Sequence, residues 1–357
     1  MYDLIIIGAG PAGATLARLV NKNYKVLVIE KRSLRKLDSN NKVNKPCGGL
    51  IAPDAQRLLG EMGLGVPKKV LVGPQVFSVR SIDIKTGKQK FYQRHYINID
   101  REKFDQYLVS LIPNQVRILE KAILRKIQPG KKNIEVFYQQ DRELKRVRTR
   151  KVIGADGANS LTRKILYPGE DVSRYLYFSI QEIFSAKKVL PYFTVLFDEQ
   201  TTDYYSWIIP KEKQLLIGSA IDDMLNARAK FEQFLKRVKK LGLGIGQKRA
   251  SQGAFIYRPT ELKSINTGRN DVVLVGEAAG FISPSSAEGL SFAFLSALAL
   301  AKAMEKDFDN ALGDYNSNCG KLIFKIIIKN WKKMFMFRPW LRNWIMATGL
   351  KSMKVDD

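Results

Sequence analysis

Cysteine and histidine are nearly absent from the sequence. Among 357 residues there are two cysteines, Cys47 and Cys319, and one histidine, His95. Two cysteines exclude a disulfide scaffold and a four-cysteine zinc site, and one histidine excludes metal sites that need several imidazoles. A Ser-His-Asp triad would depend on His95 alone. We therefore expect no metal site, and we assign no function to Cys319 or His95.

Acidic residues are scarce relative to basic ones. The chain has 60 Lys and Arg against 34 Asp and Glu, a formal net charge of +26. This excess predicts an anionic partner: a lipid, a nucleic acid or a phosphorylated small molecule. Basic clusters at residues 142–151 and 228–249 could contact nucleic acid, but no nucleic-acid-binding module is recognisable. We interpret the clusters as solvated faces and do not expect a nucleic-acid partner.

Long apolar runs are also missing. The most apolar stretch, residues 289–304, is shorter than the ~20 residues that span a bilayer and contains Lys302. The first apolar run, residues 4–7, leads into a glycine motif rather than a signal-peptide cleavage site. We therefore expect a cytoplasmic protein.

The first thirty residues contain a complete strand–helix–strand pattern. Gly8, Gly10 and Gly13 form a G-x-G-x-x-G motif between an apolar run and a helical stretch, and a second apolar run ends at Glu30. The glycines allow a tight turn, close approach of a pyrophosphate and close helix packing, while the helix N-terminus faces the phosphates. Glu30 would accept hydrogen bonds from ribose hydroxyls. The pattern predicts a dinucleotide site.

The remaining elements predict an α/β protein whose nucleotide-binding strands are interrupted by sheet-rich insertions. The first helix is expected at residues 14–21, and later helices at 101–111, 222–241 and 289–304. Predicted strands after residue 30 are 75–84, 90–99, 116–127, 133–139, 152–155, 175–183, 192–197, 204–209, 214–220 and 271–275.

Three motifs together resemble the FAD-dependent oxidoreductases of the para-hydroxybenzoate hydroxylase superfamily. The first is the N-terminal unit. The second is residues 154–160 with Arg163, similar to that family's D-G motif. The third is residues 276–280 with Pro284 and Gly289, similar to its G-D motif, although Glu277 stands where the family usually has Asp.

The resemblance implies a Rossmann-type FAD-binding domain, an antiparallel β-sheet substrate domain and a basic helical tail at the C-terminus. The expected FAD-binding domain is discontinuous (1–74, 100–165 and 266–313), with the substrate domain at 75–99 and 166–265 and the tail at 314–357. The cofactor residues implied are Gly8, Gly10, Pro11, Ala12, Gly13, Glu30, Lys31, Cys47, Gly48, Gly49, Arg101, Ala122, Asp156, Gly157, Gly276, Glu277, Gly280, Pro284, Gly289 and Leu290. Arg101 matches the arginine that these proteins direct at the FAD diphosphate.

Two finer motifs narrow the branch. Residues 45–50 and 205–211 resemble the cysteine-glycine loop and the Y-x-W-x-F-P-K element of geranylgeranyl reductases, with Ile209 in place of Phe. Longer runs resemble bacterial colicin-M-tolerance flavoproteins of the same branch. The resemblance implies reduction of double bonds in an isoprenoid or polyprenyl-phosphate lipid by hydride from reduced flavin. The implied catalytic residues are Cys47, Tyr205 and Trp207.

Each of these residues has an ordinary structural interpretation as well. Tyr205 and Trp207 are two apart on a predicted strand, so they face one side, either as walls of a pocket or as sheet packing. Cys47 would line the pocket or donate a proton; the alternative is a small buried apolar side chain. Ordered water is the other candidate for the proton donor.

Other functions are also compatible with the motifs. Residues 205–210 together with Lys68 and Lys69 resemble features of flavin halogenases. An O₂-dependent monooxygenase and a flavoprotein that binds polyprenyl phosphate without turnover are further alternatives. No separate nicotinamide motif is found, which leaves the electron donor open between NAD(P)H and a redox protein.

The C-terminal tail combines basic and aromatic residues. Residues 315–355 contain nine Lys and Arg, no Asp or Glu, and three of the four tryptophans. This composition is typical of helices lying in an anionic membrane interface, where each basic residue contributes ~1 kcal/mol. Pro339 should divide the stretch into two helices. We expect peripheral association with the inner face of the membrane; the alternative is a lid helix with a solvated basic face.

Overall fold

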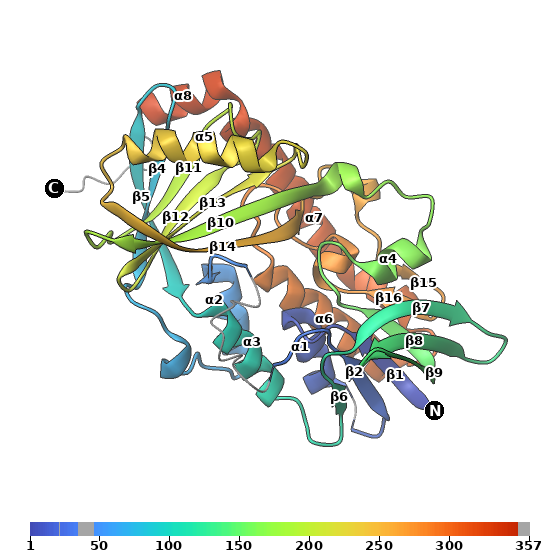
Figure 1. Ribbon diagram of the computed structural model, residues 1–357. Coiled ribbons are helices and arrows are strands. Elements are labelled where there is room, and N and C mark those ends of the chain that lie inside the picture. The colour runs from blue at the N-terminus through green and yellow to red at the C-terminus, as the bar shows by residue number, and fades with distance from the viewer. Residues whose placement is uncertain (21, 35–45, 349–357) are drawn as a thin grey trace. The chain divides into compact units, whose positions relative to one another are not determined.

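The computed structural model describes residues 1–20, 22–34 and 46–348. The chain divides into two compact units, each built from several segments (Figure 1). Unit 1 consists of residues 1–44, 102–175 and 257–329, and unit 2 of residues 45–101, 176–256 and 330–357. This division differs from the sequence-based boundaries mainly at residues 45–74, which group with unit 2 because β3 pairs with β5 there. Residues 314–329 of the expected tail group with unit 1.

The sheet of unit 1 is mainly parallel in its centre. Its strands are β1 (Tyr2–Ile7), β2 (Val26–Ile29), β6 (Arg117–Leu119), β7 (Ile123–Pro129), β8 (Ile134–Gln140), β9 (Glu143–Gly154), β15 (Gly268–Arg269) and β16 (Val272–Leu274). The order is β15-β16-β9-β1-β2-β6, and β8 joins β9 on one side and β7 on the other. All four residues of β2 are buried, which explains the continuous apolar run in its sequence.

Helices and short 3₁₀ turns complete unit 1. They are α1 (Pro11–Leu19), α3 (Arg101–Ser110), α4 (Leu161–Leu166), α6 (Leu290–Lys306), the first part of α7 (Ala311–Phe337), η2 (Ser173–Tyr175), η3 (Leu262–Ser264) and η4 (Gly276–Ala279). Helix α1 begins at Pro11 rather than at the expected Ala14. Proline is well suited to the first helical position because the amide hydrogen that it lacks has no partner within the helix.

Unit 2 is built on an eight-stranded sheet that is mostly antiparallel. Its strands are β3 (Leu50–Ile51), β4 (Val76–Asp83), β5 (Gln89–Asn98), β10 (Leu176–Ala186), β11 (Phe193–Phe197), β12 (Ser206–Lys211), β13 (Gln214–Ile221) and β14 (Ile245–Tyr257). The order is β14-β10-β13-β12-β11-β4-β5-β3, with β4 and β11 parallel. The helices are α2 (Pro53–Glu61), α5 (Ala227–Lys239), α8 (Pro339–Ala347) and the 3₁₀ turn η1 (Lys68–Val70).

One face of this sheet is covered by α5 (Figure 1). Phe231 and Phe234 of α5 pack into a core with Ile208 of β12 and other buried aliphatic residues of the sheet. Because side chains alternate along a strand, Tyr205, Trp207 and Ile209 are directed to the opposite face.

The sequence predicts only the end of β9, as the strand expected at 152–155, and does not predict β14. Most of β9 lies in the basic cluster 142–151, and β14 overlaps the end of the cluster 228–249. In β9, charged side chains occupy most of the exposed positions; Arg148, for example, pairs with Glu135 of β8 at 2.9 Å. In β14, most exposed positions hold uncharged residues, including Gly253 and the apolar Phe255, so its sequence shows no regular apolar alternation. The single strand expected at 116–127 is two strands, because Lys121 adopts a left-handed conformation (φ 54°) between β6 and β7.

The tail forms two helices, as the position of Pro339 predicts. Helix α7 ends at Phe337, and α8 begins at Pro339. Two of the nine basic residues of the predicted tail, Lys351 and Lys354, lie outside the described residues.

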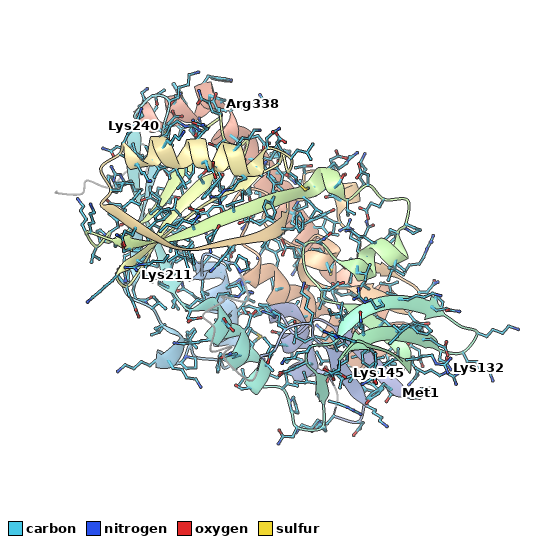
Figure 2. All side chains as sticks on the ribbon, viewed as in Figure 1. Met1, Lys132, Lys145, Lys211, Lys240 and Arg338 are labelled. Carbon is cyan, nitrogen blue, oxygen red and sulfur yellow. The ribbon has the colours of Figure 1, made fainter. Side chains whose placement is uncertain are left out.

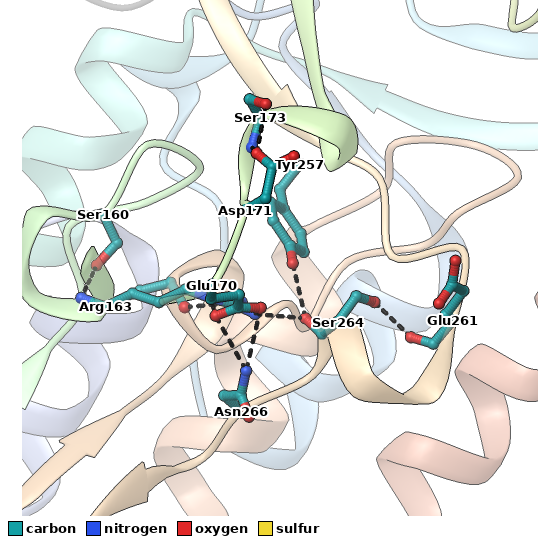
Figure 3. A network of polar contacts seen from close by, with 10 residues as sticks. Ser160, Arg163, Glu170, Asp171, Ser173, Tyr257, Glu261, Ser264 and Asn266 are labelled. Carbon is teal, nitrogen blue, oxygen red and sulfur yellow. Dashed lines mark hydrogen bonds and ion pairs between the residues drawn. The ribbon is translucent and has the colours of Figure 1, made fainter. Parts of the chain in front are cut away.

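A buried arginine joins distant segments of unit 1 (Figure 3). The Nε of Arg163 donates to Glu170 at 2.9 Å, and its Nη2 donates to the carbonyl of Ser264 at 2.8 Å. The guanidinium also lies 4.8 Å from the ring centre of Tyr257, whose hydroxyl donates to the same carbonyl of Ser264 at 2.8 Å. This network fixes the loop after β9 against the segment that follows β14.

We predict that Arg163→Met strongly destabilises unit 1. The substitution leaves Glu170 without its cation in a mostly buried position, a change that costs about 3–5 kcal/mol. Urea unfolding should show a large drop in the midpoint. Arg174→Met is the control, because the Arg174–Glu261 pair is exposed and should contribute nothing measurable. Equal midpoints for the two variants would contradict the assigned role.

Candidate functional site

The glycine motif of unit 1 has the geometry of a phosphate-binding turn. Gly8 adopts φ 101°, and a Cβ there would lie 2.6 Å from the carbonyl oxygen of Ala155. A Cβ on Gly13 would overlap the carbonyl of Gly8. Gly10 is the N-cap of α1 and has no side chain to cap the helix. The first amide groups of α1 therefore remain available, in the positive field of the helix end, for an anionic ligand.

Glu30 lies at the end of β2, in contact with the glycine turn. The amide of Ala9 donates to its Oε2 at 2.7 Å, while the amide and Nε of Arg32 donate to its Oε1 at 2.8 and 3.0 Å. Burial alone would raise the pKa of Glu30, but the charge and hydrogen bonds of Arg32, with the Ala9 amide, hold that pKa below its ordinary value. Arg32 also donates to the buried Asp105 at 2.9 Å. The lowered pKa favours the ionised carboxylate. Its Oε2 also accepts from Nη2 of Arg32 at 3.4 Å, which is the longest of the four contacts to this carboxylate.

Two further predicted cofactor residues lie beside Glu30. Lys31 is exposed. Ala122 is buried, and its amide donates to the carbonyl of Glu30 at 3.0 Å. Ala122 therefore fixes the backbone at the end of β2.

Asp156 of the D-G motif is engaged by its own segment. Its Oδ1 accepts from the hydroxyl of Ser160 at 2.5 Å, and its Oδ2 accepts from the amide and hydroxyl of Thr162 at 3.0 and 3.1 Å. Burial raises the pKa of Asp156 in spite of these hydrogen bonds. The carboxyl thus caps the start of α4. Gly157, with φ 82°, has open space where a Cβ would be.

The G-D motif brings two helix starts together. Gly276 adopts φ 58°, and a Cβ there would lie 2.9 Å from the Cβ of Ala12 in α1 and 3.8 Å from Ala293 in α6. Only glycine allows this approach. Gly289 is the N-cap of α6 and Leu290 its first residue, so α6, like α1, begins at a glycine without a side-chain cap.

Glu277, the departure from the family pattern, contacts the backbone of a neighbouring segment. Its Oε1 accepts from the amide of Tyr257 at 2.9 Å. Gly280 adopts φ 86° at the end of η4, and the carbonyl of Pro284 accepts from the buried Arg258 at 3.2 Å. The longer Glu side chain thus holds the end of β14.

In unit 2, the cysteine-glycine loop is held by Lys211. The Nζ of Lys211, at the end of β12 (Figure 2), donates to the carbonyls of Gly49 and Ile99 at 3.1 and 2.8 Å and to Oδ1 of Asn98 at 2.5 Å. These three acceptors match the three hydrogens of an ammonium group. Gly49 adopts φ 62°, and a Cβ there would lie 2.7 Å from Nζ of Lys211. The loop therefore requires glycine at this position.

The pKa of the Lys211 ammonium group is lower than that of an ordinary lysine. Burial lowers its pKa from 10.5 to about 8, although Cys47 and Asp100 oppose the shift. The three oxygen partners provide an acceptor for each hydrogen of the ammonium group, so the charged form of Lys211 is fully hydrogen-bonded.

Cys47 lies in the same loop and contacts a second cation. Nη1 of Arg101 lies 3.2 Å from Sγ of Cys47. Donation to sulfur by a guanidinium stabilises the thiolate form. The structure thus places Arg101 at the thiol. Cys319 differs completely, because burial raises the pKa of its thiol to about 12.

Tyr205 and Trp207 lie together on one side of β12, as their spacing predicts. Their ring centres are 5.9 Å apart with an edge-on arrangement. Nε1 of Trp207 donates to Oε1 of Gln181 at 3.2 Å. Gly218 of the neighbouring strand β13 lies opposite Trp207 in the sheet, and a Cβ on Gly218 would lie 2.5 Å from the indole. The indole therefore lies flat against the sheet, where a glycine leaves space for it.

The cysteine-glycine loop lies against this same face. A Cβ on Gly48 would be 2.6 Å from Cδ1 of Ile209, which is directed to the same side of β12 as Trp207. Burial raises the pKa of Tyr205 well above its ordinary value, and neighbouring tyrosines and Cys47 add to the shift. One face of the sheet in unit 2 thus carries a thiol, a neutral phenol and an indole.

The two units separate the predicted site residues. Unit 1 holds the glycine turn, Glu30 and the two motifs at 156–157 and 276–290, while unit 2 holds the cysteine-glycine loop, Arg101 and the aromatic pair. Sequence reasoning missed four residues that shape unit 2: Asn98, Gln181, Lys211 and Gly218. Lys211 ends the quoted element 205–211, so a signal for it existed, whereas the other three carry none.

Some alternatives can be examined directly. Lys68 and Lys69, the lysines considered for a halogenase, are exposed in η1. Within residues 1–20, 22–34 and 46–348, no group of three or more His, Cys, Asp or Glu side chains is placed to hold a metal ion. In the same part of the chain, no helix is long and apolar enough to cross a membrane.

We predict that Lys211→Met loosens the loop that carries Cys47. The variant leaves three oxygens without their shared donor, so Cys47 should react faster with a thiol reagent, by about tenfold, in the native protein. Because Cys319 is fully buried, the reaction reports on Cys47 alone. Lys213→Met, an exposed lysine two residues away, is the control. An unchanged rate in Lys211→Met would contradict the role of Lys211.

The same lysine predicts a pH dependence of stability. Since the pKa of Lys211 is about 8 when folded and near 10.5 when unfolded, the unfolded chain binds more protons between these values. Stability therefore rises with pH through this window. Urea unfolding should show wild type gaining stability relative to Lys211→Met between pH 8 and pH 10. A constant difference over this range would show that the lysine is not desolvated.

The comparisons with known proteins agree with this geometry. Residues 3–177 match the family model described as lycopene cyclase protein. The chain is 35% identical over 349 residues to protein CbrA of Escherichia coli O157:H7, covering 98% of this chain and 97% of that protein. The CbrA of Shigella sonnei shows the same identity and coverage. The resemblance stated from the motifs is therefore confirmed.

Solved structures share the fold. A geranylgeranyl bacteriochlorophyll reductase-like protein from Thermoplasma acidophilum has TM-score 0.73 at 20% identity, covering 99% of this chain and 88% of that one. PqsL of Pseudomonas aeruginosa, a probable FAD-dependent monooxygenase, has TM-score 0.70 at 18% identity, covering 98% and 100%. The flavin-dependent halogenase CmlS has TM-score 0.71 at 15% identity, covering 100% and 68%. The predicted fold class is confirmed: the chain belongs to the CbrA family and has the fold of FAD-dependent oxidoreductases.

Proposed function

We propose that this protein is an FAD-dependent reductase of isoprenoid double bonds. The observation that carries the proposal is the face of the sheet in unit 2, where Tyr205, Trp207 and the loop of Cys47 lie together. The motifs on this face resemble those of geranylgeranyl reductases, and a geranylgeranyl reductase-like protein shares the fold. Such a lipid substrate would be met at a membrane surface.

The residues of unit 1 fit a dinucleotide cofactor. A Cβ at Gly8, Gly13 or Gly276 would collide with neighbouring atoms of the protein, so glycine at these positions lets the turn after β1 and the segment after β16 pack closely against α1. The start of α1 would hold the diphosphate, and Glu30 would accept from a ribose hydroxyl. By resemblance, the segment from Gly276 to Leu290 would hold the ribityl chain and flavin, and the cysteine-glycine loop would border the flavin.

Reduced FAD would supply a hydride, which is one proton together with two electrons. Saturation of a double bond also needs one proton at the neighbouring carbon, so the protein must hold the alkene and admit a proton. It must also keep the surroundings apolar, because water competes for reactive groups.

Trp207 and Tyr205 are suited to holding the alkene. The indole N–H of Trp207 is already bonded to Gln181, which leaves the apolar ring for contact with a hydrocarbon. The phenol of Tyr205 stays neutral because burial raises its pKa. An aromatic face also stabilises the electron-poor carbon that develops as the proton is added.

Cys47 and ordered water are the two candidates for the proton donor. Nη1 of Arg101 lies 3.2 Å from Sγ of Cys47, and a cation at this distance stabilises the thiolate, the species left after the thiol donates its proton. Cys47→Ala separates the two cases. If Cys47 is the donor, the variant loses turnover about a hundredfold while keeping its flavin; if water is the donor, turnover falls only a few-fold.

The proposal is tested by mixing anaerobically reduced protein with isoprenoid lipids, beginning with any lipid that mass spectrometry identifies in the purified protein. We expect flavin reoxidation that depends on an unsaturated isoprenoid. A protein that only binds lipid would show a higher melting temperature with the lipid and no reoxidation. A monooxygenase would instead form product only with O₂ and an aromatic substrate. Either of these outcomes would overturn the proposal.

We predict that Gly218→Ala impairs the reaction by displacing Trp207. The new Cβ would lie 2.5 Å from the indole, so the ring must move off the sheet. The ratio kcat/KM should fall at least about tenfold with flavin content unchanged. Gly60→Ala in α2 is the control, since nothing lies within 4 Å of a Cβ there. If both variants keep wild-type kinetics, the indole does not position the substrate.

A further inference from the structure

Helix α7 presents apolar residues on two opposite faces. One face is buried and consists of Tyr315, Cys319, Leu322 and Ile326. The other consists of Phe324, Ile328, Trp331 and Phe335, which are 42% to 69% exposed. At 3.6 residues per turn, these four lie within about 60° of one another around the helix axis and about 180° from the buried set. We call them the outer stripe.

Helix α8 repeats this arrangement on a smaller scale. Arg342 is buried and donates to Asp83 at 2.6 and 2.9 Å, with its guanidinium 4.7 Å from the ring centre of Phe197. Trp340 and Trp344, one turn apart on the opposite side of α8, are 68% and 64% exposed.

The exposure of these aromatic rings is not a result of loose helices. The end of α7 is held by Phe337, which packs edge-on against Phe197 and lies near Tyr204, with ring centres 5.9 and 5.2 Å away. The inward contacts are therefore made, while six large apolar side chains stay outside. Trp in particular is seldom left so exposed, and a gathered set of this kind marks an interaction surface.

The charged residues of the two tail helices beyond Asp314 have one sign. Residues 315–348 contain seven Lys and Arg and no Asp or Glu. Lys321, Lys325 and Lys332 lie along one flank of the outer stripe, about 70° from its centre around the axis. Lys321, Lys332 and Arg338 are exposed.

We propose that the outer stripe of α7, with Trp340 and Trp344 of α8, docks on the surface of an anionic phospholipid bilayer. Apolar rings would enter the interface while the lysine flank contacts lipid phosphates. A second copy of this chain is a poorer partner, because its equivalent helices would bring a like charge to the contact. The inference goes beyond the proposed reaction and does not depend on it.

The experiment uses full-length protein with its flavin and vesicles of phosphatidylcholine, with and without phosphatidylglycerol. Co-sedimentation should show binding that requires the anionic lipid and weakens at high salt. Tryptophan fluorescence should shift to shorter wavelength on binding, since three of the four tryptophans lie in α7 and α8. Equal binding to neutral vesicles, or no binding, would overturn the proposal.

Two variants separate the apolar and ionic parts. Trp331→Ala/Phe335→Ala/Trp344→Ala should weaken binding at least about tenfold, and Lys321→Gln/Lys325→Gln/Lys332→Gln should remove the dependence on anionic lipid. The matched control is Phe77→Ala/Leu144→Ala/Leu225→Ala, which removes equally exposed apolar side chains outside the tail and should bind as wild type. Melting temperatures should stay near wild type for all three.

Two further readouts give the proposal its own test. A short, water-soluble isoprenyl substrate should be reduced equally by wild type and both tail variants, so loss of reaction and loss of membrane binding are distinguishable. Sedimentation velocity tests the alternative that the outer stripe binds a second copy of this chain. A wild-type dimer that the aromatic variant converts to a monomer, without vesicle binding, would overturn the lipid assignment.

Discussion

The arrangement in unit 2 depends on one buried ammonium group. Lys211 donates to three oxygens, two of them carbonyls of the chain segments at Gly49 and Ile99. A buried cation is tolerated only when its hydrogens are all paired, so the lysine and the loop determine each other's position. Because Lys211 ends the strand that carries Trp207, the same bonds hold the loop of Cys47 on the aromatic face. The three hydrogen bonds of Lys211 therefore set the position of the Cys47 loop on the face that carries Trp207.

In unit 1, the loops and helix starts of the site are held in place by Gly276 and Arg163. Gly276 lets Ala12 of α1 and Ala293 of α6 approach the same point, which places two uncapped helix starts near one another. Arg163 then holds the surrounding loops through Glu170 and Ser264. Positive helix ends and backbone amides suit a diphosphate, and the ionised Glu30 suits a ribose. In the proposed function, unit 1 holds the dinucleotide and the side chains of unit 2 contact an apolar substrate.

The sequence predicted the parts of the fold whose signals are local. The glycine turn, the apolar runs of β1 and β2 and the break at Pro339 each follow from neighbouring residues. Most of β9 was missed because charged residues dominate its exposed positions, and β14 was missed because its exposed positions mix basic, small and apolar residues without a regular alternation. Gln181 and Gly218 could not be found, since their importance arises from pairing across the sheet. The sequence of α7 has apolar residues on two opposite faces, and only the structure shows which of the two is buried.

The proposed reaction adds two hydrogens to an isoprenoid double bond. The most direct measurement is the mass of the lipid after turnover in heavy water. Hydrogen on the reduced flavin nitrogen exchanges with solvent. The proposed reaction therefore predicts that the lipid gains two deuterium atoms for each double bond lost, one from the hydride and one from the proton. A product that gains an oxygen atom, or a lipid returned with its mass unchanged while the flavin is reoxidised, would contradict it.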